Sequence, residues 1–384
     1  MRNSSEIRLQ RVVAYTCATL FALFSFTFIA FYQAPLLEMM YNHVATGKLE
    51  YNNVVVAGVI TAFLTLLAVW LNRFARFQRE WTAMAYLPSS LMLAFITDID
   101  RSLFTGDYSV WGWVFIFVAG TVVYLFLSFV LHRMLFEKIK NLAMSKNKIL
   151  WRNFILMVLL FSLIGTLSSS EENIKREAFV ASHYKNGETA EALLIGYNSL
   201  DASPQLTALR AYVMAKEGVL GEKLFEYPQH YAAKALLPGK KQDSPLVPDS
   251  VFALIGAEPG NNEDVVGFLK GLAYADSASS VAKEYYLSAL LLEKRLLEFK
   301  ESLYGLNDSI DVDNLPKHYR EALVLYSGID SAYVLEFADD SVVQSFDSLR
   351  NTELEHDDFV VRSNMVRKSY GRTYCGIIFT DIDL

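Results

Sequence analysis

The chain has 384 residues, of which 53% are hydrophobic and 20% are charged, and its formal net charge at pH 7 is −7. The charge is unevenly divided, because residues 1–169 carry 14 Lys and Arg against 8 Asp and Glu, whereas residues 170–384 carry 21 against 34. An acidic surface repels nucleic acid and anionic lipid head groups, so the composition excludes both as ligands of the second part.

The first part of the chain contains five apolar stretches, and each predicts a membrane-spanning helix of about 20 residues. The predicted spans are 12–32, 54–71, 81–97, 110–131 and 149–167. Pro88 predicts a kink in the third span. Arg152 lies in the first turn of the fifth, where its side chain can extend to the lipid head groups. The first span is followed by no clear cleavage site, which indicates an uncleaved signal anchor.

Basic residues lie in every second gap between these stretches, and this alternation predicts the orientation of the chain. Three arginines precede the first stretch and three follow the second. Five Lys and Arg lie between the fourth and the fifth, and Arg152 in the first turn of the fifth is the sixth of this group, whereas the other two gaps hold only Lys48 and Arg101. The positive-inside rule therefore predicts a cytoplasmic N-terminus, with everything after about residue 168 on the opposite face. Since Cys17 and Cys375 are the only cysteines, no disulfide framework is expected, which is compatible with a bacterial periplasm.

Two segments of the second part, 181–194 and 212–225, align with each other at an offset of 31 residues. The aligned pairs are Lys185 with Lys216, Gly187 with Gly218, Glu191 with Glu222, and Leu193 with Leu224. In each copy a charged residue and a glycine end one helix, which suits a left-handed cap, and a second helix follows. We expect the two leucines to be buried between helices and the two glutamates to face water.

Residues 174–230 resemble the tetratricopeptide class of helical repeats. Small residues, Ala190 and Gly221, lie where the paired helices of that class pack closely, and Pro228 follows the second pair. The resemblance implies a curved stack of helical hairpins whose concave surface binds a protein or peptide partner. A non-repetitive α-helical domain remains the alternative.

The rest of the chain predicts further helices. Residues 279–303 have the period of one long helix. Asn314 is expected to cap the next helix. Thr352 begins a capping-box pattern for a helix that stops at Gly371. The closing apolar stretch 373–379 is too short to cross a membrane, so it is expected to dock on the domain.

The whole layout resembles an uncharacterised family of bacterial multi-span proteins classed as a domain of unknown function. The resemblance rests on the several spans, the repeat-like segment and the sequence YGRTYCGIIF near the end. It implies a membrane protein of the bacterial envelope and transfers no catalytic residue.

The sequence contains one cluster with possible chemistry, formed by Asp98, Asp100 and Arg101 on the predicted outer face after the third span. Paired carboxylates can act as a base or hold a divalent ion, as in membrane glycosyltransferases with acidic external loops. A helix end that enters water also commonly carries Asp and Arg. Because the six histidines are scattered singly and no HExxH, P-loop or GxGxxG motif occurs, we expect no metal or cofactor.

We therefore predict an all-α protein with a five-helix transmembrane bundle over residues 1–169 and a tetratricopeptide-like, α-helical extracytoplasmic domain over residues 170–384. The main hypothesis is a membrane-anchored periplasmic protein-interaction or scaffold protein of the bacterial inner membrane, without enzymatic activity. Its expected partners are membrane lipid and a protein or peptide, and not nucleic acid. The alternative is an envelope transferase that acts on a lipid-linked saccharide through the outer-face carboxylates.

Overall fold

The computed structural model describes residues 4–45, 51–75, 81–133, 145–168, 171–238, 250–257, 264–306, 311, 314–330, 333–335, 340–355 and 358–381. Every regular element in these ranges is a helix, which confirms the all-α class. The chain divides into two compact units, Met1–Lys175 and Arg176–Leu384.

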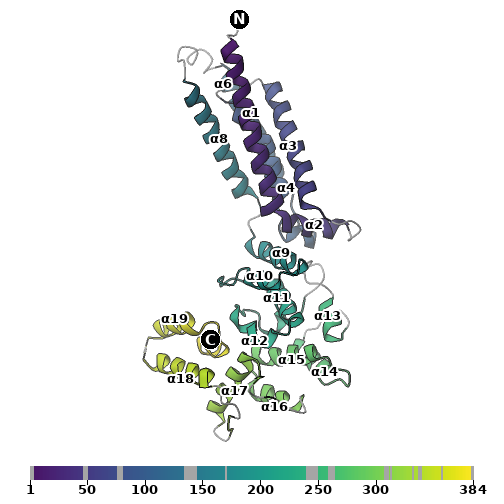
Figure 1. Ribbon diagram of the computed structural model, residues 1–384, viewed down its shortest axis with the longest axis vertical. Coiled ribbons are helices and arrows are strands. Elements are labelled where there is room, and N and C mark those ends of the chain that lie inside the picture. Colours follow the sequence, from purple (N-terminus) through teal and green to yellow (C-terminus); the bar gives the residue numbers. More distant parts are fainter. Residues whose placement is uncertain are drawn as a thin grey trace. The chain divides into compact units, whose positions relative to one another are not determined.

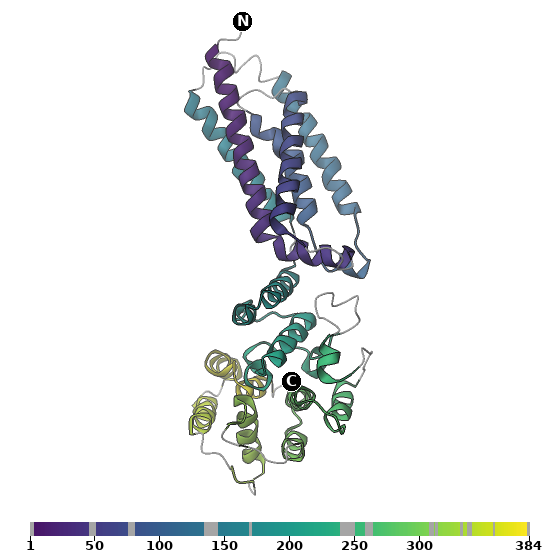
Figure 2. The same cartoon turned by 45° about the vertical axis from the view of Figure 1, so that its right-hand side comes forward.

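Apolar helices lie side by side in the first unit (Figures 1 and 2). They are α1 (Ser4–Thr27, continued by a π-helical turn Phe28–Tyr32), α3 (Asn53–Ala75), α4 (Leu87–Thr97), α6 (Trp111–Arg133) and α8 (Lys146–Leu167). Three segments, Arg8–Tyr32, Asn53–Arg73 and Lys146–Leu167, are long and apolar enough to cross a membrane. Thr82–Thr97 and Trp111–Phe126 are shorter apolar helices. The described residues therefore indicate a membrane protein, and the count of five spans stays a prediction.

The third predicted span differs from its expected form at Pro88. A 3₁₀ turn, Thr82–Tyr86, is followed by α4, and Pro88 lies in the first turn of that helix. The proline therefore does not kink a continuous helix, because a first turn has no need of its missing N–H group. The Ser89 hydroxyl donates a hydrogen bond to the Leu64 carbonyl at 3.0 Å, which connects α4 to α3.

Two short helices of the first unit were not predicted, α2 (Ala34–Ala45) and α5 (Ser102–Thr105). Figure 1 shows α2 turned away from the direction of α1. It buries Leu36 and Met39. An amphipathic helix of this length was missed because the sequence around it lacks a continuous apolar run.

The second unit consists of short helices around one hydrophobic core. They are α9 (Glu172–Lys185, which begins in the first unit), α10 (Thr189–Leu194), α11 (Pro204–Lys216), α12 (Leu220–Lys223), α13 (Ser250–Ile255), α14 (Val265–Ala273), α15 (Ser280–Leu292), α16 (Leu296–Gly305), α17 (Lys317–Ile329), α18 (Asp340–Glu355), α19 (Phe359–Tyr370) and α20 (Tyr374–Asp381). The largest fully buried side chains of this core are Tyr285, Tyr286, Tyr374, Phe225 and Phe299. The buried rings come from helices far apart in the sequence, so the unit folds around them as a whole.

The turns of the predicted repeat have the expected geometry. Gly187 and Gly218 adopt φ angles of 79° and 67°, so both end a helix in the left-handed conformation. Leu193 and Leu224 are both buried, as predicted. The second helix of each pair is short, however, with six residues in α10 and four in α12. Membership of the tetratricopeptide class stays a prediction.

Glu222 does not face water as predicted, although its aligned counterpart Glu191 is exposed. The Glu222 Oε2 atom lies 2.5 Å from the backbone nitrogen of Lys317 and accepts its hydrogen bond. Lys317 is the first residue of α17. Asn314, the predicted cap of α17, donates instead to the Asp311 carboxylate at 2.6 Å. The prediction of the cap was therefore wrong, because the capping group comes from a distant part of the chain.

Two further predictions from local patterns were wrong. The predicted helix over residues 279–303 is two helices, α15 and α16, because Lys294 between them has a φ angle of 58°. The helix α19 is capped by Asp358, which accepts hydrogen bonds from Val360 and Val361, and not by Thr352, which lies within α18. The closing segment docks as expected, since Tyr374 and Cys375 are buried.

Candidate functional site

The Asp98 side chain follows the last residue of α4 and is held by a tryptophan of α6. Its Oδ2 atom accepts a hydrogen bond from Trp113 Nε1 at 2.6 Å. Trp113 is only 6% exposed and packs edge-on against Phe95, so its ring belongs to the packed interior of the first unit. Burial raises the pKa of Asp98, the Trp113 hydrogen bond partly lowers it, and the nearby charge of Asp100 raises it further.

Asp100 and Arg101 are also engaged by neighbouring groups. The Asp100 Oδ1 atom accepts from the Ser102 backbone nitrogen at 2.9 Å and from the Ser102 hydroxyl at 2.5 Å. Arg101 donates through its backbone nitrogen and its Nε atom to the Glu171 carboxylate, at 3.3 and 3.4 Å. The three predicted site residues thus lie together, and their contacts start α5 and connect α4 with α6. Among the residues that the structure describes, no group of three or more His, Cys, Asp and Glu is arranged to hold a metal ion.

A second polar cluster, which was not predicted, is buried in the second unit. His318 is fully buried, and its Nδ1 atom lies 2.9 Å from Glu321 Oε2. The same carboxylate oxygen accepts a hydrogen bond from the backbone nitrogen of Tyr374 at 2.7 Å. The Glu321 carboxyl group therefore joins the His318 ring of α17 to the first residue of α20.

The surroundings of this pair are closed and apolar. The Phe225 ring meets His318 and Tyr374 edge-on, with centroid distances of 5.2 and 4.9 Å. The Cys375 thiol lies 3.6 Å from the Glu321 carbonyl oxygen, and burial raises its pKa well above the ordinary value. A neutral, inaccessible thiol is a poor nucleophile. The cluster therefore holds α20 against α17. In the sequence, only the three-residue spacing of His318 and Glu321 on one helix indicates that these two side chains can meet.

A groove of about 510 Å³ lies in the second unit between the turn after α11, the helices α15 and α16, and the start of α17. Its lining includes the buried side chains of Leu287, Leu303 and Tyr319. Lys283 and Asp311 are among its polar residues. The groove thus combines an apolar lining with charges of both signs.

Glu284 and Gly221 fix one wall of this groove. The Glu284 Oε1 atom accepts a hydrogen bond from the Gly221 backbone nitrogen at 2.9 Å. Burial raises the pKa of Glu284, and hydrogen bonds from Gly221 and Leu220 partly lower it. A Cβ atom at Gly221 would lie 2.9 Å from the Tyr319 ring, so only glycine allows the close approach of α12 to α17.

One protein-family model matches the chain, and it is described as "Family of unknown function (DUF6057)". It matches residues 259–375, a segment that includes the residues of the buried His318–Glu321 cluster and most of the groove. No curated protein matches the chain. No solved structure matches it either.

Proposed function

We propose that this chain is a membrane-anchored scaffold protein of the bacterial envelope, whose α-helical second unit binds a peptide segment of a partner protein in the periplasm. The observation that carries the proposal is the groove between α15, α16 and the start of α17. It joins an apolar lining to charged residues, which is the usual make-up of a site for a peptide or small ligand.

The size of the groove supports this function. Its volume of about 510 Å³ lies within the range of roughly 300–1,000 Å³ that is typical of ligand sites. One or two apolar side chains of the partner would contact Leu287, Leu303 and Tyr319, and burial of their surface would drive binding. Lys283 and Asp311 would select partners that carry charges of the opposite sign at the matching positions.

The compartment and the span count belong to the same proposal. Alternating basic gaps support five spans with a cytoplasmic N-terminus, and the resemblance to tetratricopeptide repeats supports a helical stack with a concave binding surface. The acidic composition of residues 170–384 supports a partner segment that carries a basic residue opposite Asp311, in addition to the acidic residue opposite Lys283.

Site-specific photocrosslinking in intact cells tests the proposed function. We expect a photoreactive residue at Ser280, which lines the groove and is exposed, to give an adduct of one defined mass. The same residue at Glu191, exposed on α10, should not give that adduct. Lys283→Glu should reduce the adduct, whereas Lys270→Glu on the exposed face of α14 should leave it unchanged. Equal labelling at Ser280 and Glu191 would rule out the groove as the binding site.

A further inference from the structure

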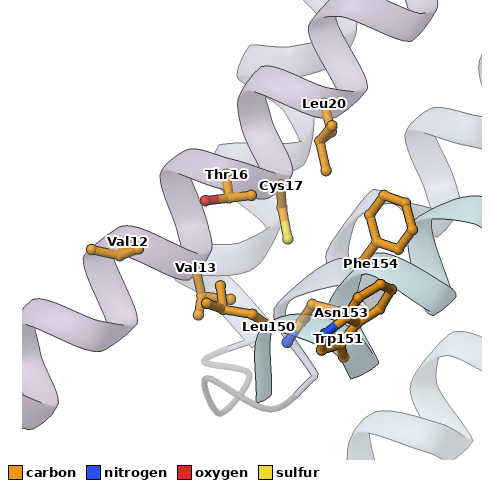
Figure 3. A pocket seen from close by; sticks show the side chains of 9 residues that line it. All are labelled: Val12, Val13, Thr16, Cys17, Leu20, Leu150, Trp151, Asn153 and Phe154. Carbon is orange, nitrogen blue, oxygen red and sulfur yellow. The ribbon is translucent and has the colours of Figure 1, made fainter. Parts of the chain in front are cut away.

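An apolar cleft of about 350 Å³ lies between α1 and α8 in the first unit (Figure 3). Residues of α1, among them Val12, Thr16 and Leu20, form one side, and residues of α8, among them Leu150 and Phe154, form the other. Asn153 also lines the cleft, but its side-chain oxygen accepts from the Ala83 backbone nitrogen and its nitrogen donates to the Ile149 carbonyl. The lining therefore suits a hydrocarbon chain better than a polar ligand.

The two helices run in the same direction. Near their starts, residues 12–20 of α1 share the cleft with residues 150–154 of α8. Further along, the Phe24 and Phe161 rings stack with their centroids 4.0 Å apart. The first residues of α1 and α8 therefore lie at the same end of the bundle. At 1.5 Å per residue, residues 12–20 extend over about 12 Å, which is less than half of a hydrocarbon core of about 30 Å.

Basic residues lie at this end, each within about one helical turn of the residues that line the cleft. They are Arg8 and Arg11 on α1 and Lys146, Lys148 and Arg152 on α8, and the same two helix starts contain one acidic residue, Glu6. Four of them, Arg8, Arg11, Lys146 and Lys148, are exposed. The Arg152 guanidinium lies 4.9 Å from the centre of the Trp81 ring. These charges give this end of the cleft a positive potential, which attracts an anion.

We propose that the cleft holds an acyl chain of an anionic phospholipid whose phosphate lies among the basic residues at the starts of α1 and α8. Charge complementarity selects the head group, because the ammonium of a zwitterionic lipid would meet like charges. Because the cleft extends over less than half of the hydrocarbon core, its lipid belongs to the leaflet at this end of the bundle. Both helices are among the segments able to cross a membrane, so the cleft lies where lipid chains are present. The site is independent of the groove proposed above.

Native mass spectrometry of the full-length protein, released from detergent micelles with added lipid, tests the proposal. Phosphatidylglycerol should be retained more strongly than phosphatidylethanolamine with the same acyl chains. The double variant Arg8→Gln/Arg11→Gln should weaken retention of phosphatidylglycerol about 25-fold, since each charge near a membrane surface contributes about fivefold. Arg73→Gln, an exposed basic residue in the last turn of α3, is the control and should have no effect.

A second pair of variants separates the cleft from the charged surface. Thr16→Phe places a ring in the cleft and should reduce retention of phosphatidylglycerol, whereas Thr19→Phe, exposed on the same helix but outside the cleft, should not. Circular dichroism and size-exclusion chromatography verify that each variant is folded. Equal retention of the two lipids would overturn the assignment of the head group. Unchanged retention in the folded Thr16→Phe variant would overturn the assignment of the acyl chain to the cleft.

Discussion

The carboxylate of Glu222 lies 2.5 Å from the backbone nitrogen of Lys317 and caps α17 from a position 95 residues earlier in the chain. The first N–H groups of a helix have no partner within the helix, and Pro316 at the N-cap position has no side-chain acceptor. Glu222 supplies the acceptor that is missing. The hairpin of α11 and α12 is therefore joined to the segment that matches the uncharacterised family.

Replacement of Glu222 should reveal how much this long-range cap stabilises the protein. We expect Glu222→Ala to lower the free energy of unfolding by about 1 kcal/mol, the usual cost of a lost N-cap. Urea denaturation of the full-length protein in detergent, followed by circular dichroism, measures the change. Glu191→Ala at the aligned exposed position should change it by less than about 0.5 kcal/mol. Equal effects of the two variants would show that the Glu222 contact does not stabilise α17.

The Cys375 thiol should be unreactive in the folded protein. Burial raises its pKa and removes it from solvent, so the thiolate needed for alkylation is not formed near neutral pH. In a Cys17→Ala background, we expect maleimide at pH 8 to label Cys375 only after denaturation. Glu321→Leu, which leaves the His318 Nδ1 atom and the Tyr374 backbone nitrogen without their hydrogen-bond partner, should make labelling occur at a lower urea concentration. Rapid labelling of the untreated protein would contradict the buried position of α20.

Glu284 should make the second unit less stable as pH rises. Its pKa in the folded state is raised by burial, so the protonated form is favoured on folding. The stability from this group is present below the unfolded pKa of about 4.3 and is lost as pH rises through the higher folded value. Glu284→Gln stays neutral and can still accept from Gly221. The free energy of unfolding of Glu284→Gln, relative to the parent, should therefore increase between pH 4 and pH 7. The control is Glu301→Gln on the surface of α16, whose free energy of unfolding relative to the parent should stay constant over this range.

The sequence predicted the features that depend on composition or on one short turn. The apolar runs of α1, α3 and α8 are long enough to identify, and Gly187 and Gly218 mark left-handed helix ends by residue type alone. The wrong predictions concern groups whose partners are distant or whose conformation is rare. The cap by Glu222 depends on how α12 packs on α17, and the break at Lys294 interrupts a stretch whose period remains helical.

The candidate sites show the same division. The sequence predicts a pair of carboxylates because Asp98 and Asp100 are only two positions apart, yet their roles as acceptors for Trp113 and Ser102 depend on the fold. The groove draws its lining from positions between Gly218 and Tyr319, so no local pattern indicates it. From the sequence, the basic residues at the starts of α1 and α8 predict only the orientation of the chain, because the parallel packing of the two helices is not visible there.

Replacement of Asp98 and Asp100, the carboxylates of the predicted outer face, separates a structural role from the transferase alternative. Asp98→Asn/Asp100→Asn keeps an oxygen that can accept from Trp113 and from Ser102 but removes both negative charges. We expect the variant to be abundant, correctly inserted and able to restore the phenotype of a deletion strain. Asp107→Asn, exposed on the same loop, is the control. A stable, inserted variant that fails to restore the phenotype would favour the transferase, since only a chemical role needs the charge.

Fusions to a reporter that is active only in the periplasm test the proposed topology. Because basic residues lie in alternate gaps, we expect activity after Gly106 and after Leu384, and no activity after Gln78 or Asn141. The fusion after Leu384 depends on α8, whose first turns contain three basic residues before the apolar run. If α8 did not cross the membrane, that fusion would be silent while the one after Gly106 stayed active. If instead the fourth stretch failed to cross, the fusion after Asn141 would be active, so the four fusions together identify which span was miscounted.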